Sequence, residues 1–145
     1  NLPVRQERSA WRDASLSQRH RDWGFNLPAA DIDFLLLEFN RGRASALVEY
    51  KRFNAKHYSL TSRTMQALTD LADRAGLPFA IAKYWPGTWS FQVTPMNALA
   101  SEHFASDEIL TEHEYVQRLY QISGQIMWNA LVGQLNHTRH IAPAT

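Results

Sequence analysis

The chain has 145 residues, of which 45% are hydrophobic and none is cysteine, and its formal net charge is +1. This length and hydrophobic fraction predict one domain with a single buried core. The absence of cysteine excludes a disulfide framework and thiolate zinc sites, and it favours a reducing, cytoplasmic compartment. No apolar run approaches the roughly 18 residues of a membrane span, so we expect no membrane partner.

The first predicted elements are a polar helix and a hairpin of two strands. The helix covers residues 7–22 and ends near Gly24. Residues 32–39 and 43–51 are apolar runs on either side of a short polar turn. Apolar runs of this length that flank a turn with glycine are typical of paired antiparallel strands.

The middle of the chain predicts a second helix. Apolar residues recur at intervals of three and four within residues 60–75, and Ser59 or Thr61 is the expected N-cap. Gly76 follows this periodic segment and suits the left-handed position that ends many helices. We therefore expect the helix to stop there.

The last part of the chain predicts two more strands and a long helix. Residues 78–84 and 89–93 are the strands, with a turn at 85–87, and residues 111–135 carry the apolar stripe of one helix. The order is then helix, strand, strand, helix, strand, strand, helix. This order predicts a single domain over 1–145 of the α/β or α+β class, with a central mixed β-sheet flanked by helices and an extra C-terminal helix.

The length of the hairpin loop decides which charged side chains face each other. Side chains alternate along a strand, so Glu49 and Lys51 share one face. A three-residue loop over 40–42, with glycine in the left-handed position, sets Asp33 opposite Glu49, and we favour this register. A loop longer by two residues sets Asp33 opposite Lys51. A four-residue loop sets Asp33 opposite Tyr50 and separates the two acids.

The favoured register predicts a metal site. Two carboxylates directly opposite each other repel, and a hard divalent cation removes that repulsion. Mg²⁺ takes carboxylate oxygens and keeps several waters, so Asp33 and Glu49 are candidate ligands. Lys51 lies on their face, where an ammonium group can hold a water or stabilise charge on a phosphate. An ordinary hairpin with polar ends is the alternative explanation.

Positive charge is concentrated around this hairpin. Residues 41–63 hold six basic side chains against one acidic side chain, Glu49. A basic rim around carboxylates is typical of a protein that binds a phosphate backbone, and a solvated charged surface is the alternative. The residues we expect to contact nucleic acid are Arg19, His20 and Arg21 at the end of the first helix, and Arg52, Lys56 and Arg63 beyond the hairpin.

The hairpin resembles the motif of the PD-(D/E)XK nuclease superfamily. Asp33 stands at the position of the acid before the first strand, and Glu49, Tyr50 and Lys51 form the (D/E)XK element, while the proline before the acid is absent. The resemblance covers a core of about residues 7–94. The segments RHRDWG, LPFAIAKY and EYVQRLY are also similar to small phage and prophage proteins with this core.

The resemblance implies a restriction-endonuclease-like fold and Mg²⁺- or Mn²⁺-dependent cleavage of DNA in a bacterial host or by a phage-encoded protein. It assigns Asp33 and Glu49 as metal ligands and Lys51 as the catalytic lysine. It also implies that the main-chain carbonyl of Tyr50 is a further ligand. Duplex, single-stranded or branched DNA and RNA all stay open as substrates.

Two further acids are weaker candidates for metal ligands. Asp31 lies two residues before Asp33 and would share its strand face. Some members of the family add a glutamate from the first helix, and Glu7 is the nearest such residue here. The alternative function is a catalytically inactive nuclease-fold protein that binds DNA or protein. A homodimer is compatible with the small size of the chain.

Overall fold

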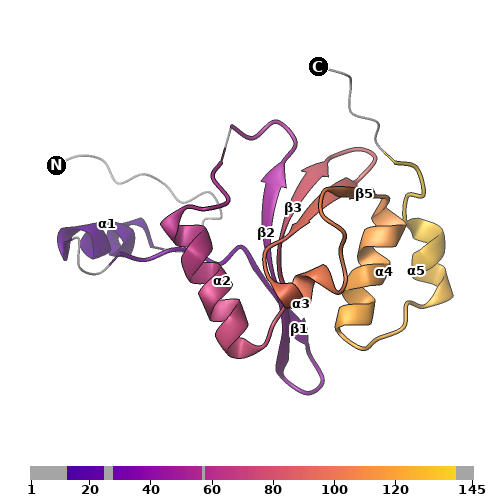
Figure 1. Ribbon diagram of the computed structural model, residues 1–145, viewed down its shortest axis with the longest axis horizontal. Helices are drawn as coiled ribbons and strands as arrows, with labels where there is room; N and C mark the ends of the chain where they lie inside the picture. Colours follow the sequence, from indigo (N-terminus) through magenta and orange to yellow (C-terminus); the bar gives the residue numbers. More distant parts are fainter. Residues whose placement is uncertain (1–12, 25–27, 57, 140–145) are drawn as a thin grey trace. The chain divides into compact units, whose positions relative to one another are not determined.

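A computed structural model of the chain describes residues 13–24, 28–56 and 58–139. It divides into two compact units, the first ending at Asp31 and the second beginning at Ile32 (Figure 1). The first unit contains one helix, and the second contains the sheet with the remaining helices among the described residues.

The helix of the first unit is α1 (Ala14–Asp22). Asp13 is its N-cap, and one Asp13 carboxylate oxygen accepts hydrogen bonds from the backbone N–H and the hydroxyl of Ser15 at 2.9 and 2.6 Å. Gly24 follows the helix with a φ of 98°, so the predicted end near this glycine is confirmed. The predicted first turns, residues 7–12, lie outside the described residues.

The second unit is built on a five-stranded mixed sheet with helices on both faces (Figure 1). The strands lie in the order of their numbering: β1 (Phe34–Glu38), β2 (Arg43–Arg52), β3 (Phe79–Trp85), β4 (Ser90–Pro95) and β5 (Glu108–Leu110). β2 and β3 are parallel, and the other neighbouring pairs are antiparallel. The predicted class, a central mixed sheet flanked by helices, is confirmed. The short strand β5 was not predicted.

The helix α2 (Arg63–Ala75) connects the parallel strands β2 and β3. Its N-cap is Ser62, whose hydroxyl accepts a backbone N–H of the first turn at 3.2 Å. The predicted N-caps, Ser59 and Thr61, are therefore wrong. The Ser59 hydroxyl instead accepts the backbone N–H of Thr61 at 3.2 Å, which forms a local turn before the helix. The predicted end is confirmed, because Gly76 takes a left-handed φ of 70°.

Two apolar clusters cover the two faces of the sheet. Because successive strand residues point to opposite faces, Leu47 and Val48 contribute to different clusters. Leu47 packs with residues of β3 and α2: Phe79, Ile81, Met65, Leu68 and Ala72. Val48 packs with residues of β3, β4, β5, the helix α4 (Glu112–Ile122) and the short helix α3 (Ala98–Ser101): Ala80, Ala82, Phe91, Val93, Leu110, Tyr115 and Ala100. Figure 1 accordingly shows α2 and α4 on opposite sides of the sheet.

The single helix predicted over residues 111–135 is wrong. The segment forms two helices, α4 (Glu112–Ile122) and α5 (Asn129–Gln134). Gly124 ends α4 because it takes a left-handed φ of 71° just after the helix. Ile126, an apolar residue within the predicted helix, lies in the connection between the two helices and is 93% exposed.

Candidate functional site

The turn of the hairpin is longer by one residue than predicted. Glu38 pairs with Arg43, which leaves the four residues 39–42 in the loop. The backbone N–H of Gly42 donates to the carbonyl of Phe39 at 3.2 Å, and Gly42 has the expected left-handed φ of 62°. By itself, a four-residue loop would separate the predicted pair of acids.

A β-bulge restores the register that brings the acids together. The pairing shifts by one residue between Leu36 and Leu37, where Ser45 is the extra residue on β2. Beyond the bulge Phe34 pairs with Val48, so the residue that precedes Phe34, Asp33, comes opposite Glu49. The predicted pairing is therefore reached by two compensating changes.

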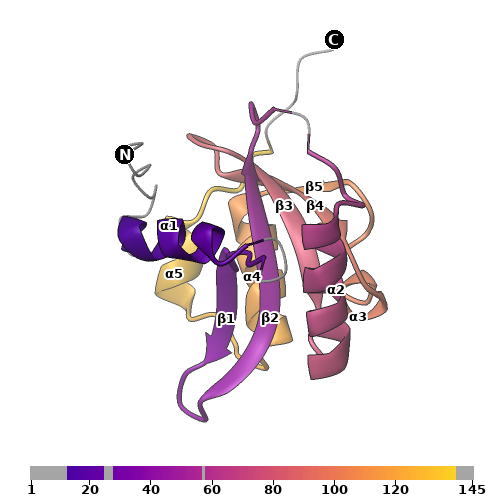
Figure 2. The ribbon, with the colours of Figure 1, turned by 90° about the vertical axis from the view of Figure 1, so that its left-hand side faces the viewer.

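Asp33 is exposed and lies directly before β1. Its carboxylate accepts a hydrogen bond from the backbone N–H of Tyr50 at 3.1 Å. β2 extends past the start of β1, as Figure 2 shows, so this side chain replaces the backbone partner that a longer β1 would supply. The N–H and C=O of one strand residue point to the same side, so the carbonyl of Tyr50 is directed toward the same edge.

Glu49 is buried on β2, with 12% of its side chain exposed. Burial, the negative charge of Asp33 and a hydrogen bond with the Asp33 carboxyl raise the pKa of Glu49 to about 7. The positive charge of Lys51 and the backbone N–H of Asp33 oppose that increase in pKa only in part. Without a metal, the Glu49 carboxyl therefore keeps its proton up to near neutral pH, because its ionised form would be buried beside the charge of Asp33.

Lys51 extends over the same face of the sheet as Glu49. Its Nζ lies 3.9 Å from Oε1 of Glu49 and 5.2 Å from the ring centroid of Tyr58. The side chain is 27% exposed, so the ammonium group is held near the acids and is still open to solvent. Asp33, Glu49 and Lys51 are thus brought together as the hairpin pattern predicts.

The donor atoms at this site fit a hard divalent cation. Two carboxylates and a backbone carbonyl are oxygen ligands of the kind that Mg²⁺ and Mn²⁺ take. A cation would also relieve the repulsion that raises the pKa of Glu49. Within the described ranges, no group of three or more His, Cys, Asp or Glu side chains is placed to hold a metal. The described residues would therefore supply two carboxylates and the Tyr50 carbonyl, and waters would supply other ligands.

The other predicted metal ligands are placed differently. Asp31 is exposed and is the last residue of the first unit, whereas Asp33 belongs to the second. Glu7 lies outside the described residues. Asp33, in the second unit, contacts β2 through the hydrogen bond from the Tyr50 N–H at 3.1 Å.

The predicted nucleic-acid residues fall on both units. Arg19, His20 and Arg21 form the last turn of α1, where cations interact favourably with the negative end of the helix dipole. Arg52 ends β2, and Lys56 follows it in an exposed segment. Three of these residues have a local partner. The ring centroids of His20 and Trp23 are 5.0 Å apart, and Arg52 Cζ lies 5.7 Å from the centroid of the Phe53 ring. The exposed Arg63 donates a hydrogen bond to Gln66 Oε1 at 2.9 Å.

One basic residue near the acids was missed by the sequence analysis. Lys83 of β3 pairs directly with Lys51 of β2 and so lies on the same face. A lysine within the apolar run of residues 78–84 was a signal that this strand is not buried along its whole length. The pairing itself joins strands that are far apart in the sequence, so local patterns did not reveal it.

The arrangement of Asp33, Glu49 and Lys51 is the observation that bears most directly on function. Among the described residues, no helix is long and apolar enough to cross a membrane. Comparisons of the chain with protein-family models, with curated proteins and with solved structures found no match.

Proposed function

We propose that the chain is a metal-dependent nuclease of the PD-(D/E)XK superfamily, with a restriction-endonuclease-like fold, that hydrolyses phosphodiester bonds in DNA. The observation that carries this proposal is the meeting of Asp33, Glu49 and Lys51 at one end of the hairpin, with Lys51 Nζ 3.9 Å from Glu49. The acid before β1 and the Glu-x-Lys element near the end of β2 stand in the order that the superfamily motif requires.

Each residue of the site has a distinct chemical part in this proposal. Asp33 and Glu49, with the Tyr50 carbonyl, would hold Mg²⁺ or Mn²⁺. When bound, the metal supplies Lewis-acid polarisation of the phosphate and lowers the pKa of water. Lys51 orients the attacking water and stabilises negative charge that develops on the phosphate. The water oxygen forms a bond to phosphorus and gives up a proton to solvent water. The bond between phosphorus and the sugar oxygen breaks, and that oxygen takes a proton from solvent to become a hydroxyl.

The basic residues of the second unit support the binding of a polyanion. Arg52, Lys56 and Arg63 are exposed at the end of β2, in the following segment and at the start of α2. Lysine and arginine contacts to phosphates release counterions, so such binding weakens steeply as salt increases. In this proposal these side chains hold the backbone while the acids act on one phosphodiester bond.

The proposal is tested by cleavage of plasmid, linear and branched DNA with Mg²⁺ and Mn²⁺. We expect cleavage with either metal and none in EDTA. Lys51→Ala should reduce the rate by roughly 10²- to 10³-fold, the usual loss when one group that stabilises charge in the transition state is removed. The matched control is Arg74→Ala, which removes an exposed cation that pairs with Asp70 in the preceding turn of α2, at 3.1 Å. If Lys51→Ala cleaves as fast as the parent chain, the catalytic assignment is wrong.

A further inference from the structure

Lys83 belongs to a polar row that crosses three strands. The parallel register pairs Lys51 of β2 with Lys83 of β3, and the antiparallel register pairs Lys83 with Gln92 of β4. Paired residues of neighbouring strands lie on the same face, and neighbouring strands are about 4.8 Å apart. The row from Lys51 to Gln92 is therefore about 10 Å long and runs across the strand direction.

This row lies on the face of the sheet that α2 covers only in part. Phe79 and Ile81 precede Lys83 on that face of β3, and both are buried in the cluster that α2 makes with the sheet. Lys83 is the next residue along the same face and is half-buried. The face thus changes from apolar to basic where the paired lysines begin, beside Glu49.

The ammonium group of Lys83 differs from that of Lys51 in its partners. Lys51 lies near the Glu49 carboxylate, whereas no described carboxylate lies within 4.0 Å of Lys83 Nζ. Lys83 Nζ lies over the Trp85 ring, 5.8 Å from its centroid. Two like charges directly opposite each other in a sheet are unfavourable, and an anion placed against both removes that cost.

We propose that Lys51 and Lys83 form a phosphate-binding pair, in which Lys83 contacts the backbone phosphate next to the one that is cleaved. This inference rests on the proposed nuclease function for the identity of the cleaved phosphate. One strand of DNA carries a phosphate about every 3.4 Å of helix axis, so a row of about 10 Å can meet more than one phosphate. The nucleic-acid strand then crosses the sheet from β2 toward β4.

A purely structural role for Lys83 is the competing explanation. The aliphatic stem of a lysine can cover apolar surface while its charge reaches solvent, and the Trp85 ring provides such a surface. Lys83→Met keeps a long unbranched stem and removes the charge, and Lys83→Arg keeps the charge. The two variants therefore separate the contribution of the stem from that of the positive charge.

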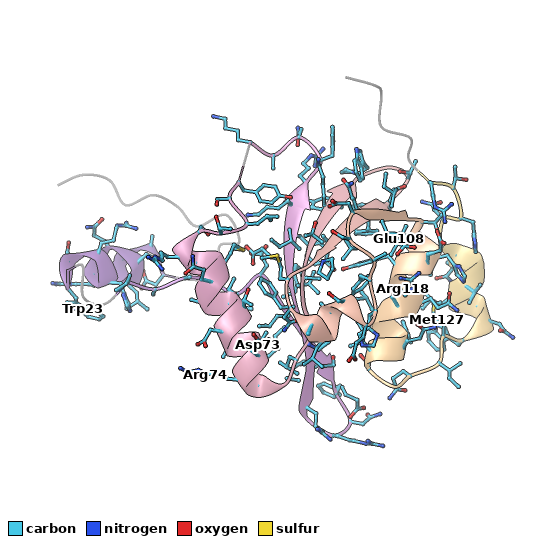
Figure 3. The ribbon with its side chains drawn as sticks, in the orientation of Figure 1. Trp23, Asp73, Arg74, Glu108, Arg118 and Met127 are labelled. Atoms are coloured by element: carbon cyan, nitrogen blue, oxygen red, sulfur yellow. The ribbon has the colours of Figure 1, made fainter. Side chains whose placement is uncertain are left out.

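Binding is measured without cleavage, by fluorescence anisotropy of labelled single-stranded and duplex oligonucleotides in EDTA, over a series of salt concentrations. We expect Lys83→Met to weaken binding roughly tenfold at low salt, the loss of one charge-assisted contact. The slope of log affinity against log salt should decrease by about 1, and Lys83→Arg should restore both quantities. Arg74→Met is the matched control, because it makes a similar change at an exposed cation outside the row of Lys51, Lys83 and Gln92. Figure 3 shows Arg74 near the C-terminal end of α2.

The outcomes separate this inference from the proposed function. If the parent chain cleaves DNA and Lys83→Met binds with the parent's affinity and salt slope, the phosphate pair is wrong and the nuclease proposal stands. If the parent binds through Lys83 but does not cleave with Mg²⁺ or Mn²⁺, the phosphate pair stands and the nuclease proposal is wrong. An equal loss of affinity in Lys83→Met and Lys83→Arg, with an unchanged midpoint of thermal unfolding in both, would also overturn the role of the charge.

Discussion

Glu49 and Asp33 are two carboxyl groups held side by side, one buried in the sheet and one exposed before it. Their pairing could be predicted from the sequence, because alternation along two strands fixes which residues share a face. The raised pKa of Glu49 could not be predicted, because its largest cause is burial. Burial depends on what the rest of the chain places over β2.

The shifted pKa of Glu49 predicts how the stability of the metal-free protein depends on pH. The pKa rises from its usual value of 4.5 to about 7 on folding, so the folded chain binds this proton more tightly than the unfolded chain. Raising the pH through this window therefore lowers the free energy of unfolding, by on the order of 3 kcal/mol for a shift of this size. Glu49→Gln should remove that loss and be more stable than the parent at pH 8, measured by urea unfolding in EDTA.

Other carboxyl groups also make the stability depend on pH, so the contribution of Glu49 is obtained by comparing the parent with Glu49→Gln. The Thr111 N–H and Arg139 hold the pKa of Glu114 below its usual range, and that group contributes stability that is lost as the pH falls. This contribution is present in both the parent and Glu49→Gln, so it cancels in the difference between them. An equal change in unfolding free energy between pH 5 and pH 8 in the two proteins would contradict the raised pKa of Glu49.

The hairpin shows how far turn chemistry alone can predict a register. The glycine-containing turn and the two apolar strands were predictable from local patterns. The extra loop residue and the bulge at Ser45 were not, because nothing in the segment RASALVEYK marks one residue as unpaired. The pairing of Asp33 with Glu49 was predicted from a three-residue loop, and the structure reaches it through a different loop.

The C-terminal segment was mispredicted for a related reason. A single glycine within an apolar stripe is tolerated in many helices, so Gly124 did not by itself predict a break. The break is decided by tertiary packing, because Leu119 and Ile122 of α4 reach the apolar cluster on the sheet while Ile126 lies beyond it and is exposed. The apolar stripe was therefore a good guide to α4 and a poor guide to the residues after it.

The N-cap of α2 gives a prediction at the scale of one element. The Ser62 hydroxyl accepts the backbone N–H of Met65 at 3.2 Å, so Ser62→Ala leaves a helix N–H without its side-chain partner. We expect a loss of about 1 kcal/mol in unfolding free energy. Ser59→Ala is the matched control, because Ser59 lies in the exposed turn before the helix and should cost much less. Equal losses in the two variants would argue that Ser62 does not cap α2.

At the scale of the whole molecule, the candidate site depends on contacts between distant parts of the chain. Glu49 lies on β2 and Asp33 directly precedes β1 of the same hairpin, so a local pattern predicted their meeting. Lys83 is brought beside them by the parallel pairing of β3 with β2. In the sequence these two strands are separated by α2. Pairings of this kind are set by how the helix packs against the sheet, and this sequence pattern did not reveal them.

Metal binding should stabilise the whole second unit, because a ligand that binds only the folded state adds to the free energy of unfolding. At pH 8 the Glu49 proton has left, so Mn²⁺ at about 100 times its dissociation constant should add about 2.7 kcal/mol, seen as a rise in the midpoint of thermal unfolding. The rise should shrink as the pH falls below 7, because protons then compete for Glu49. Asp33→Asn combined with Glu49→Gln should abolish it, whereas Asp70→Asn, on the exposed side of α2, should not. A rise that persists in the double variant would place the metal elsewhere and favour the catalytically inactive, DNA- or protein-binding alternative.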